Sequence, residues 1–204
     1  MFATIITLLM QAITATISVL GYPGVFLLMA LESGGLPVPS EIIMPFAGFV
    51  VSTGKLNFWV VVAMGTLGNL VGSLAAYAIG RAGGRPLLER YGKYILISHR
   101  DLDMAERWFA KHGDATVFFG RLLPVVRTYI SFPAGIAGMN WKTFSAYTTL
   151  GALLWSILFT WLGTLLGDNW VLVEHKLRDF NLVILGALIA VVILFFWRHR
   201  RATR

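Results

Sequence analysis

Two glutamates and two arginines interrupt apolar sequence, and they are the chain's main candidates for chemistry. Glu32 ends an uncharged run that starts at the N-terminus, and Glu41 follows it across a segment with two prolines and two glycines. Arg121 and Arg127 lie on either side of a proline in a second apolar region. A charged side chain at the depth of a bilayer costs roughly 2.5–3.5 kcal/mol on insertion scales. The presence of four such side chains in apolar sequence therefore indicates a functional site.

The four side chains suit anion binding combined with proton transfer. A guanidinium offers a planar fork of donors that matches phosphate, so Arg121 and Arg127 would hold an anionic group. Glu32 and Glu41 would carry protons or complete a polar path to that group. Ser40 would cap a helix beside Glu41 and add a hydroxyl to the substrate site. The structural alternative is that both glutamates pair with the arginines and only lock the chain together.

Other kinds of site find no support in the sequence. The chain has no cysteine, so disulfides and thiolate chemistry are excluded. It has no Gly-rich phosphate loop and no Gly-x-Ser-x-Gly nucleophile motif. The histidines lack partners at metal-ligand spacing; they are His99, His112, His175 and His199. We therefore expect no metal site, no cofactor and no enzymatic activity.

The composition is that of an integral membrane protein. Hydrophobic residues make up 57% of the 204 residues and charged residues 13%, whereas soluble domains have roughly 45–50% and 25%. The net charge is +7. Its basic residues lie between apolar runs, where they indicate topology and contact with anionic lipid headgroups at the cytoplasmic face rather than nucleic acid.

Run length separates membrane-spanning segments from shorter ones. A spanning helix needs about 20 apolar residues, and shorter runs broken by proline and glycine are typical of re-entrant elements. We expect one membrane domain over 1–204, made of an N-terminal helix (5–31, interrupted near Gly21), a re-entrant hairpin (36–52), a transmembrane helix (56–80), an amphipathic cytoplasmic connector (81–114), a second re-entrant hairpin (115–138) and two transmembrane helices (143–167 and 180–197).

Proline and glycine are the residues expected to form the two hairpins, because they break helices and free backbone groups. In the first hairpin these are Pro37, Pro39, Pro45 and Gly48, and in the second they are Gly120, Pro124, Pro133, Gly135 and Gly138.

Basic residues predict the orientation. Of the 17 lysines and arginines, 12 fall in 81–111, at Lys142 or in the tail after 197, and three fall at Lys55, Lys176 and Arg178. The positive-inside rule places the larger group in the cytoplasm. Both termini are then cytoplasmic, and residues 168–178 are outside.

An internal repeat links the two halves of the chain. Residues 66–68 recur as 149–151, and the same offset of 83 residues pairs Ser73 with Ser156 and Gly80 with Gly163. Each helix follows a hairpin with an Ala-Gly pair, and the two helices run in opposite directions, which is typical of an inverted-topology repeat. Ordinary packing of small residues is the alternative. The predicted fold class is an all-α polytopic membrane protein, with an inverted-topology repeat of two opposed re-entrant helical hairpins plus transmembrane helices.

These motifs resemble the DedA membrane proteins, which share the VTT domain. The resemblance covers roughly residues 15–170 and rests on Glu32-Ser33, Pro37, Pro39-Ser40-Glu41, Pro45-Phe46-Ala47-Gly48, Gly113, Phe118, Gly120-Arg121, Pro124, Arg127, Pro133-Ala134-Gly135, Gly138-Met139 and Phe144. It implies lipid translocation, and the Pro-Ser-Glu hairpin is most similar to bacterial undecaprenyl-phosphate carriers. It also implies that the family's two essential acids and two essential arginines correspond to Glu32, Glu41, Arg121 and Arg127. Members with a Pro-Gly-Asp loop differ here, which weakens any transfer of their drug or proton exchange roles.

The expected function is translocation of a phosphate-bearing lipid, undecaprenyl phosphate, across the bacterial cytoplasmic membrane, with proton coupling through the glutamates. The alternatives are a phospholipid flippase or scramblase, for example of phosphatidylethanolamine, and a proton-coupled ion or drug antiporter. A membrane enzyme acting on lipid phosphate is a further alternative, and the sequence lacks the nucleophile that it would need. The oligomeric state does not follow from the sequence.

Overall fold

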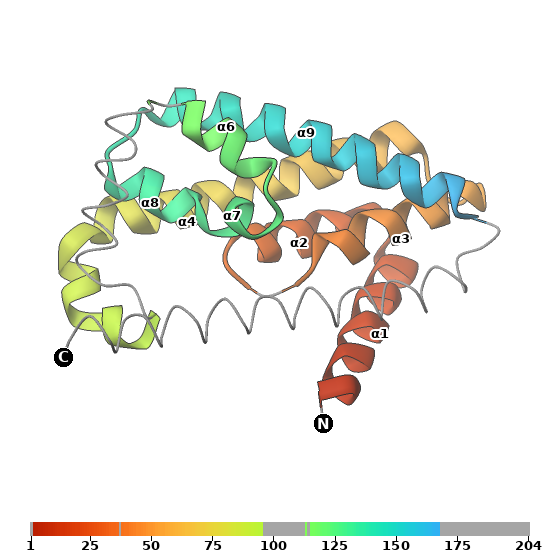
Figure 1. Ribbon diagram of the computed structural model, residues 1–204. Helices are drawn as coiled ribbons and strands as arrows, with labels where there is room; N and C mark the ends of the chain where they lie inside the picture. The colour runs from red at the N-terminus through yellow and green to blue at the C-terminus, as the bar shows by residue number, and fades with distance from the viewer. Residues whose placement is uncertain (1, 37, 96–112, 114, 168–204) are drawn as a thin grey trace. The chain divides into compact units, whose positions relative to one another are not determined.

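The computed structural model describes residues 2–36, 38–95, 113 and 115–167, and all regular structure in these ranges is helical. Figure 1 shows the helices in chain order. Two helical stretches among the described residues are long and apolar enough to cross a membrane, Phe58–Gly83 and Trp141–Leu165. They correspond to the transmembrane helices predicted at 56–80 and 143–167. The predicted helix at 180–197, the tail after it, Pro37 and nearly all of the connector after 95 lie outside the described residues.

The N-terminal apolar run forms two helices, α1 (Phe2–Leu20) and α2 (Tyr22–Ser33). Gly21 separates them with φ 61°, a left-handed conformation that favours glycine. Pro23 lies in the first turn of α2, where its missing N–H costs no helical hydrogen bond.

A glycine turn joins α2 to α3 (Ser40–Ser52). Gly35 has φ 106°, its N–H donates to the Glu32 carbonyl (3.1 Å), and the next N–H donates to the carbonyl of residue 31 (3.1 Å). This pattern is a Schellman motif, which ends the helix. The range 36–52, predicted to hold a whole hairpin, therefore contains only one helix, α3. The helix on the other side of the turn is α2. The predicted N-cap role of Ser40 is wrong, because Pro39 occupies that position and Ser40 is the first helical residue.

The helix α4 (Phe58–Ile95) is longer than the predicted span. The transmembrane helix was expected to end at Gly80 and to be followed by an amphipathic connector, and the structure assigns helix to the next 15 residues as well. These residues include Gly83, Gly84 and Pro86, which disfavour a straight helix, and the ribbon bends toward the C-terminal end of α4 (Figure 1). The predicted connector therefore begins as an extension of the transmembrane helix.

The second apolar region forms three short helices before a long one. They are α6 (Ala115–Arg121), α7 (Pro124–Tyr129) and α8 (Ser131–Ile136), followed by α9 (Trp141–Leu165). Pro124 begins α7, as its fixed φ allows. Gly138, with φ 68°, turns the chain after α8, and the Asn140 side chain caps α9 by accepting from the Lys142 N–H (2.9 Å).

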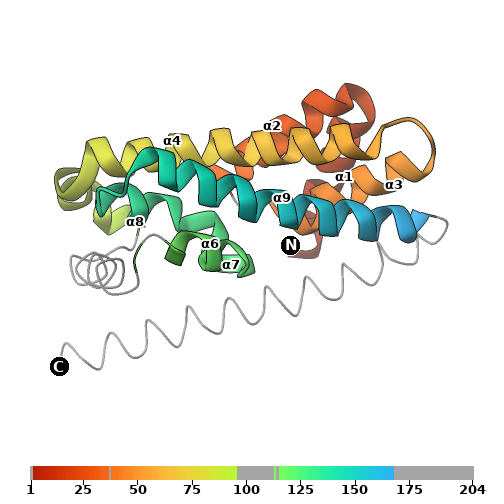
Figure 2. The ribbon, with the colours of Figure 1, turned by 90° about the horizontal axis from the view of Figure 1, so that it is seen from above.

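Helices far apart in sequence pack together. Helices α4 and α9 lie side by side (Figure 2), α2 and α8 pack on α4, and α3 and α6 pack on α9. A hydrophobic cluster fills the space between α4, α6, α8 and α9; its buried members are Tyr77, Val117, Ala134, Met139 and Phe144.

Two glycines allow α3 to touch the backbone of α9. A Cβ at Gly48 would collide with the Thr160 carbonyl oxygen, and a Cβ at Gly163 would collide with the Pro45 carbonyl oxygen. Neither position can carry a side chain without moving a backbone.

The contact between α8 and α4 has the same pattern. A Cβ at Gly135 would collide with the Tyr77 carbonyl oxygen, and a Cβ at Gly80 with the Phe132 carbonyl oxygen. Tyr77 and Gly80 on α4 lie 83 residues before Thr160 and Gly163 on α9. This separation equals the offset of the sequence repeat. The short helix of each half therefore packs on the long helix of the other half.

Candidate functional site

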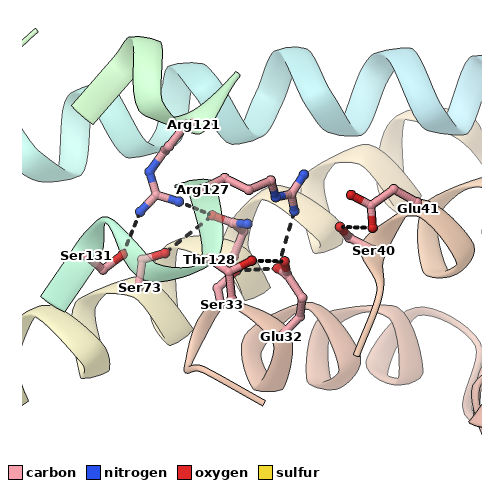
Figure 3. Close-up of polar contacts among 10 residues, drawn as sticks. Glu32, Ser33, Ser40, Glu41, Ser73, Arg121, Arg127, Thr128 and Ser131 are labelled. Carbon is pink, nitrogen blue, oxygen red and sulfur yellow. Dashed lines mark hydrogen bonds and ion pairs between the residues drawn. The ribbon is translucent and has the colours of Figure 1, made fainter. Parts of the chain in front are cut away.

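Glu32 and Arg127 form a buried ion pair between the end of α2 and α7 (Figure 3). Arg127 Nη2 lies 3.3 Å from Glu32 Oε2, and the two side chains are 3% and 5% exposed. Thr128 donates to Glu32 Oε1 (3.1 Å) and Ser33 donates to Glu32 Oε2 (2.9 Å). A carboxylate near a helix C-terminus meets an unfavourable dipole, so these partners are what make its burial tolerable.

Arg121 joins four helices through hydrogen bonds. From α6 its Nε donates to Thr148 on α9 (3.1 Å), Nη1 to Asn69 on α4 (3.0 Å) and Nη2 to Ser131 on α8 (3.0 Å). The Asn69 oxygen also accepts from the Ser73 hydroxyl (3.4 Å). The planar fork of arginine fits partners in three directions, which an ammonium group does not.

The partners of Arg121 within the described residues are all neutral. Its aliphatic part packs on α9 at Gly151, where a Cβ would lie 3.0 Å from Arg121 Cβ. The guanidinium carbon lies 5.6 Å from the centre of the Phe144 ring, a cation–π contact. The described site thus buries the two guanidiniums with one paired carboxylate, Glu32, and carries an excess of positive charge.

Glu41 stands apart from this network. It lies in the first turn of α3, partly buried, and the Ser40 hydroxyl is 3.5 Å from its Oε2. No ion pair with an arginine forms at Glu41 among the residues that the structure describes. A helix N-terminus favours a carboxylate, which is consistent with a charged Glu41 without a cationic partner.

Buried polar atoms of Arg127 and of α9 have no hydrogen-bond partner within the described part of the chain. They are Arg127 Nη1 and, on α9, Trp155 Nε1, Ser156 Oγ and Thr160 Oγ1. The Arg127 guanidinium carbon lies 4.6 Å from the centre of the Trp155 ring. Most buried polar groups in proteins are hydrogen-bonded, so these atoms are exceptions.

The predicted hairpin residues fall into turns and helix contacts. Pro39, Pro124 and Gly138 lie at helix ends, whereas Pro45 and Gly48 lie inside α3, and Pro133 and Gly135 lie inside α8. Gly120 lies in α6, where a Cβ would collide with the Ile130 side chain. Gly48, Gly120 and Gly135 therefore allow close packing rather than a turn.

Several residues of the site were missed by the sequence reasoning. They are Ser33, Asn69, Ser73, Thr128, Ser131, Thr148 and Trp155. Asn69 and Ser73 did carry a signal, since they are polar residues one turn apart in an apolar helix. Trp155 carried none, because an indole in a membrane helix is usually an interface anchor or packing.

The described site combines charge-assisted donors from arginine, which suit an anion, with the carboxylates of two glutamates. No group of three or more His, Asp or Glu side chains within the described ranges could hold a metal ion.

Comparisons with known proteins give the following matches. The VTT domain matches residues 38–165. Undecaprenyl phosphate transporter A of Bacillus subtilis is 39% identical over 193 residues, covering 95% of this chain and 96% of that protein. An alkaline phosphatase-like protein of Lactococcus lactis is 38% identical over 188 residues, covering 88% of each. Protein DedA of Escherichia coli is 31% identical over 187 residues, covering 89% of this chain and 84% of that protein. No solved structure matches the chain.

Proposed function

The chain belongs to the VTT domain family of membrane proteins, the DedA family, and we propose that it carries a phosphate-bearing lipid across the membrane. The substrate we propose is a polyprenyl phosphate, undecaprenyl phosphate. The name of the Bacillus subtilis relative supports this choice, since that protein covers nearly all of the chain.

The observation that carries the proposal is the state of Arg127. Its guanidinium is buried, one of its terminal nitrogens is paired with Glu32, and the other has no partner among the residues that the structure places. A buried donor without a partner costs about 1–3 kcal/mol, and an anionic oxygen in that place would remove the cost. Phosphate suits such a donor because charge-assisted hydrogen bonds to arginine are strong and directional.

We assign proton coupling to the two glutamates. Glu41 is partly buried and forms no ion pair with any described residue, so exchange of its proton would break none of the described ion pairs. Glu32 holds Arg127, so protonation of Glu32 would weaken that pair and alter the affinity for an anion. Ser40, buried beside Glu41, completes the proposed polar path.

We propose that the two halves form an inverted-topology repeat with opposed re-entrant hairpins, α2–α3 and α6–α7–α8. The exchanged glycine contacts of α3 with α9 and of α8 with α4 support this arrangement. Transporters built in this way bind substrate where broken helices meet near the middle of the bilayer. The Glu32–Arg127 pair joins the two proposed hairpins.

The proposed setting is the bacterial cytoplasmic membrane, with both termini inside and anionic lipid headgroups contacting the basic connector. The bacterial relatives and the distribution of basic residues support it.

A second candidate is an enzyme that hydrolyses lipid phosphate. The alkaline phosphatase-like name of the Lactococcus lactis relative favours it. Among the described residues, the Arg121–Arg127 network includes no His or Cys that could act as a nucleophile. We therefore place transport first, and the experiment below includes a test for released phosphate.

The test is a flipping assay on the purified protein in liposomes. Fluorescent polyprenyl phosphate, the matching polyprenol and labelled phosphatidylethanolamine are compared for transbilayer movement, with inorganic phosphate measured in parallel. We expect movement of the polyprenyl phosphate alone, without phosphate release. Equal movement of the polyprenol would contradict recognition of phosphate, movement of phosphatidylethanolamine alone would favour the phospholipid flippase, and phosphate release would favour the enzyme.

A further inference from the structure

We propose that Trp155 is a substrate-binding residue, whose indole N–H donates to the phosphate group held by Arg127. This inference rests on the proposed function and extends it to a residue outside the four charged side chains. Its starting point is the contact between the two side chains, in which the guanidinium carbon lies 4.6 Å from the ring centre.

Both side chains of this contact hold a buried donor that finds no partner within the described ranges. These donors are Arg127 Nη1 and Trp155 Nε1. Tryptophan in a buried position usually finds a partner for its N–H, so a tryptophan there for packing alone would be expected to bond its nitrogen. A ligand with two acceptor oxygens would accept a hydrogen bond from each of these two donors. A phosphate group has such oxygens.

The surroundings hold both groups in place. Arg127 is fixed by Glu32, which is itself held by Thr128 and Ser33. The Trp155 ring packs against Phe159, one turn further along α9, with ring centres 4.6 Å apart. Groups that are positioned before the ligand arrives lose little entropy on binding, which favours a specific site.

The two arginines then have different tasks. The described hydrogen bonds of Arg121 use one N–H on each of its three nitrogens to hold the helices, while its charge can attract an anion. Arg127 Nη1 and Trp155 Nε1 supply donors that have no partner in the described part of the chain. Because the indole donor is neutral, it can bond a phosphate group that carries either one or two negative charges.

The experiment compares Trp155→Phe with the wild type. Phenylalanine keeps an aromatic ring for Arg127 and removes the N–H donor together with one ring of the indole. Trp161→Phe, at a position 50% exposed on the same helix, is the matched control. Binding of a short-chain prenyl phosphate to the protein in detergent is measured by calorimetry, and thermal unfolding is measured without ligand.

We expect Trp155→Phe to raise the Kd for prenyl phosphate by about tenfold or more, because a hydrogen bond to a charged group is lost. Its unfolding temperature should fall only slightly, since the ring packing that is lost is offset by the removal of an unpartnered buried donor. Trp161→Phe should match the wild type in both measurements. A purely structural Trp155 predicts lower stability and unchanged affinity.

An unchanged Kd in folded Trp155→Phe would overturn the assignment while leaving the proposed function intact. Failure of the wild type to bind prenyl phosphate would overturn the proposed function, and this inference with it. If Trp155→Phe does not fold, ¹⁵N-indole spectra of the wild type provide the test. One of its 7 tryptophan N–H signals should shift on addition of prenyl phosphate and not of prenol; no shift would refute the assignment.

Discussion

At the scale of single residues, the two buried arginines are stabilised in different ways. Arg127 is paired with a carboxylate and stacked on an indole, whereas Arg121 donates to three neutral oxygens. A charge removed from water needs either a counter-ion or a full set of hydrogen bonds. The four charged residues are therefore not two equivalent pairs, and substitutions at them should have different consequences.

Arg127→Gln should destabilise the fold by about 3–5 kcal/mol, because it leaves Glu32 buried without its cation. The double variant Glu32→Gln with Arg127→Gln should regain most of this stability, since no buried charge remains at the pair. Transport should stay absent, because the donor for the anion is gone. Thermal unfolding in detergent and the flipping assay measure the two effects. Normal transport by the double variant would show that the pair is only a brace.

Arg121→Lys should lower the unfolding free energy by at least about 2 kcal/mol, although the charge is kept. An ammonium cannot serve oxygens on α4, α8 and α9 together, so buried partners lose their donors. Arg81→Lys on α4 is the control; Arg81 is exposed, so water can replace what its substitution removes. Equal losses in both variants would argue against the bridging role of Arg121.

Glu41→Gln should fold with nearly wild-type stability, because Glu41 has no ion pair among the described residues. Transport should fall strongly and lose its response to an imposed pH gradient, since an amide cannot exchange a proton. Glu32→Gln, by contrast, should lose stability as well. Liposomes with an imposed gradient give the measurement. A Glu41→Gln protein that still follows the gradient would exclude this residue from coupling.

At the scale of helices, the sequence predicted which segments form helices better than it predicted how those helices pack together. Apolar run length identified the helices that became α4 and α9, and the glycine at 21 predicted the break between α1 and α2. The end of α4 was missed, because Gly83, Gly84 and Pro86 favour a break in the sequence where the structure keeps helix. The neutral partners of Arg121 and the contact of Trp155 with Arg127 depend on tertiary packing, so no local pattern encodes them.

Gly48→Ala and Gly135→Ala should each destabilise the protein by about 1–3 kcal/mol, because the new methyl group meets a backbone carbonyl of α9 or α4. Similar losses are expected, since the two contacts have the same pattern. Ala75→Val, at an exposed position of α4, adds more volume and should have little effect. Thermal unfolding in detergent measures the stability of the three variants. A stable Gly48→Ala protein would mean that α3 can move away from α9 at low cost.

At the scale of the whole molecule, the orientation in the membrane can be tested directly, because the chain has no cysteine. Lys55 follows α3 and Lys142 begins α9, and both are exposed. The distribution of basic residues predicts that Lys55→Cys reacts with an impermeant thiol reagent in intact cells and that Lys142→Cys reacts only after lysis. The reverse labelling pattern would invert the topology.

The packing of α3 on α9 has a consequence for the order of events during synthesis. The last residue of α3 and the first residue of α9 are Ser52 and Trp141, so α3 is made long before its partner exists. At a synthesis rate of roughly 5–20 residues per second, the ribosome takes about 5–20 s to produce the chain between them. During that time the face of α3 around Gly48 lacks its α9 partner. The nascent chain therefore depends on the insertion machinery to shelter this segment, and ribosome-nascent chains arrested before residue 141 should crosslink α3 to that machinery, whereas chains arrested well after 165 should not.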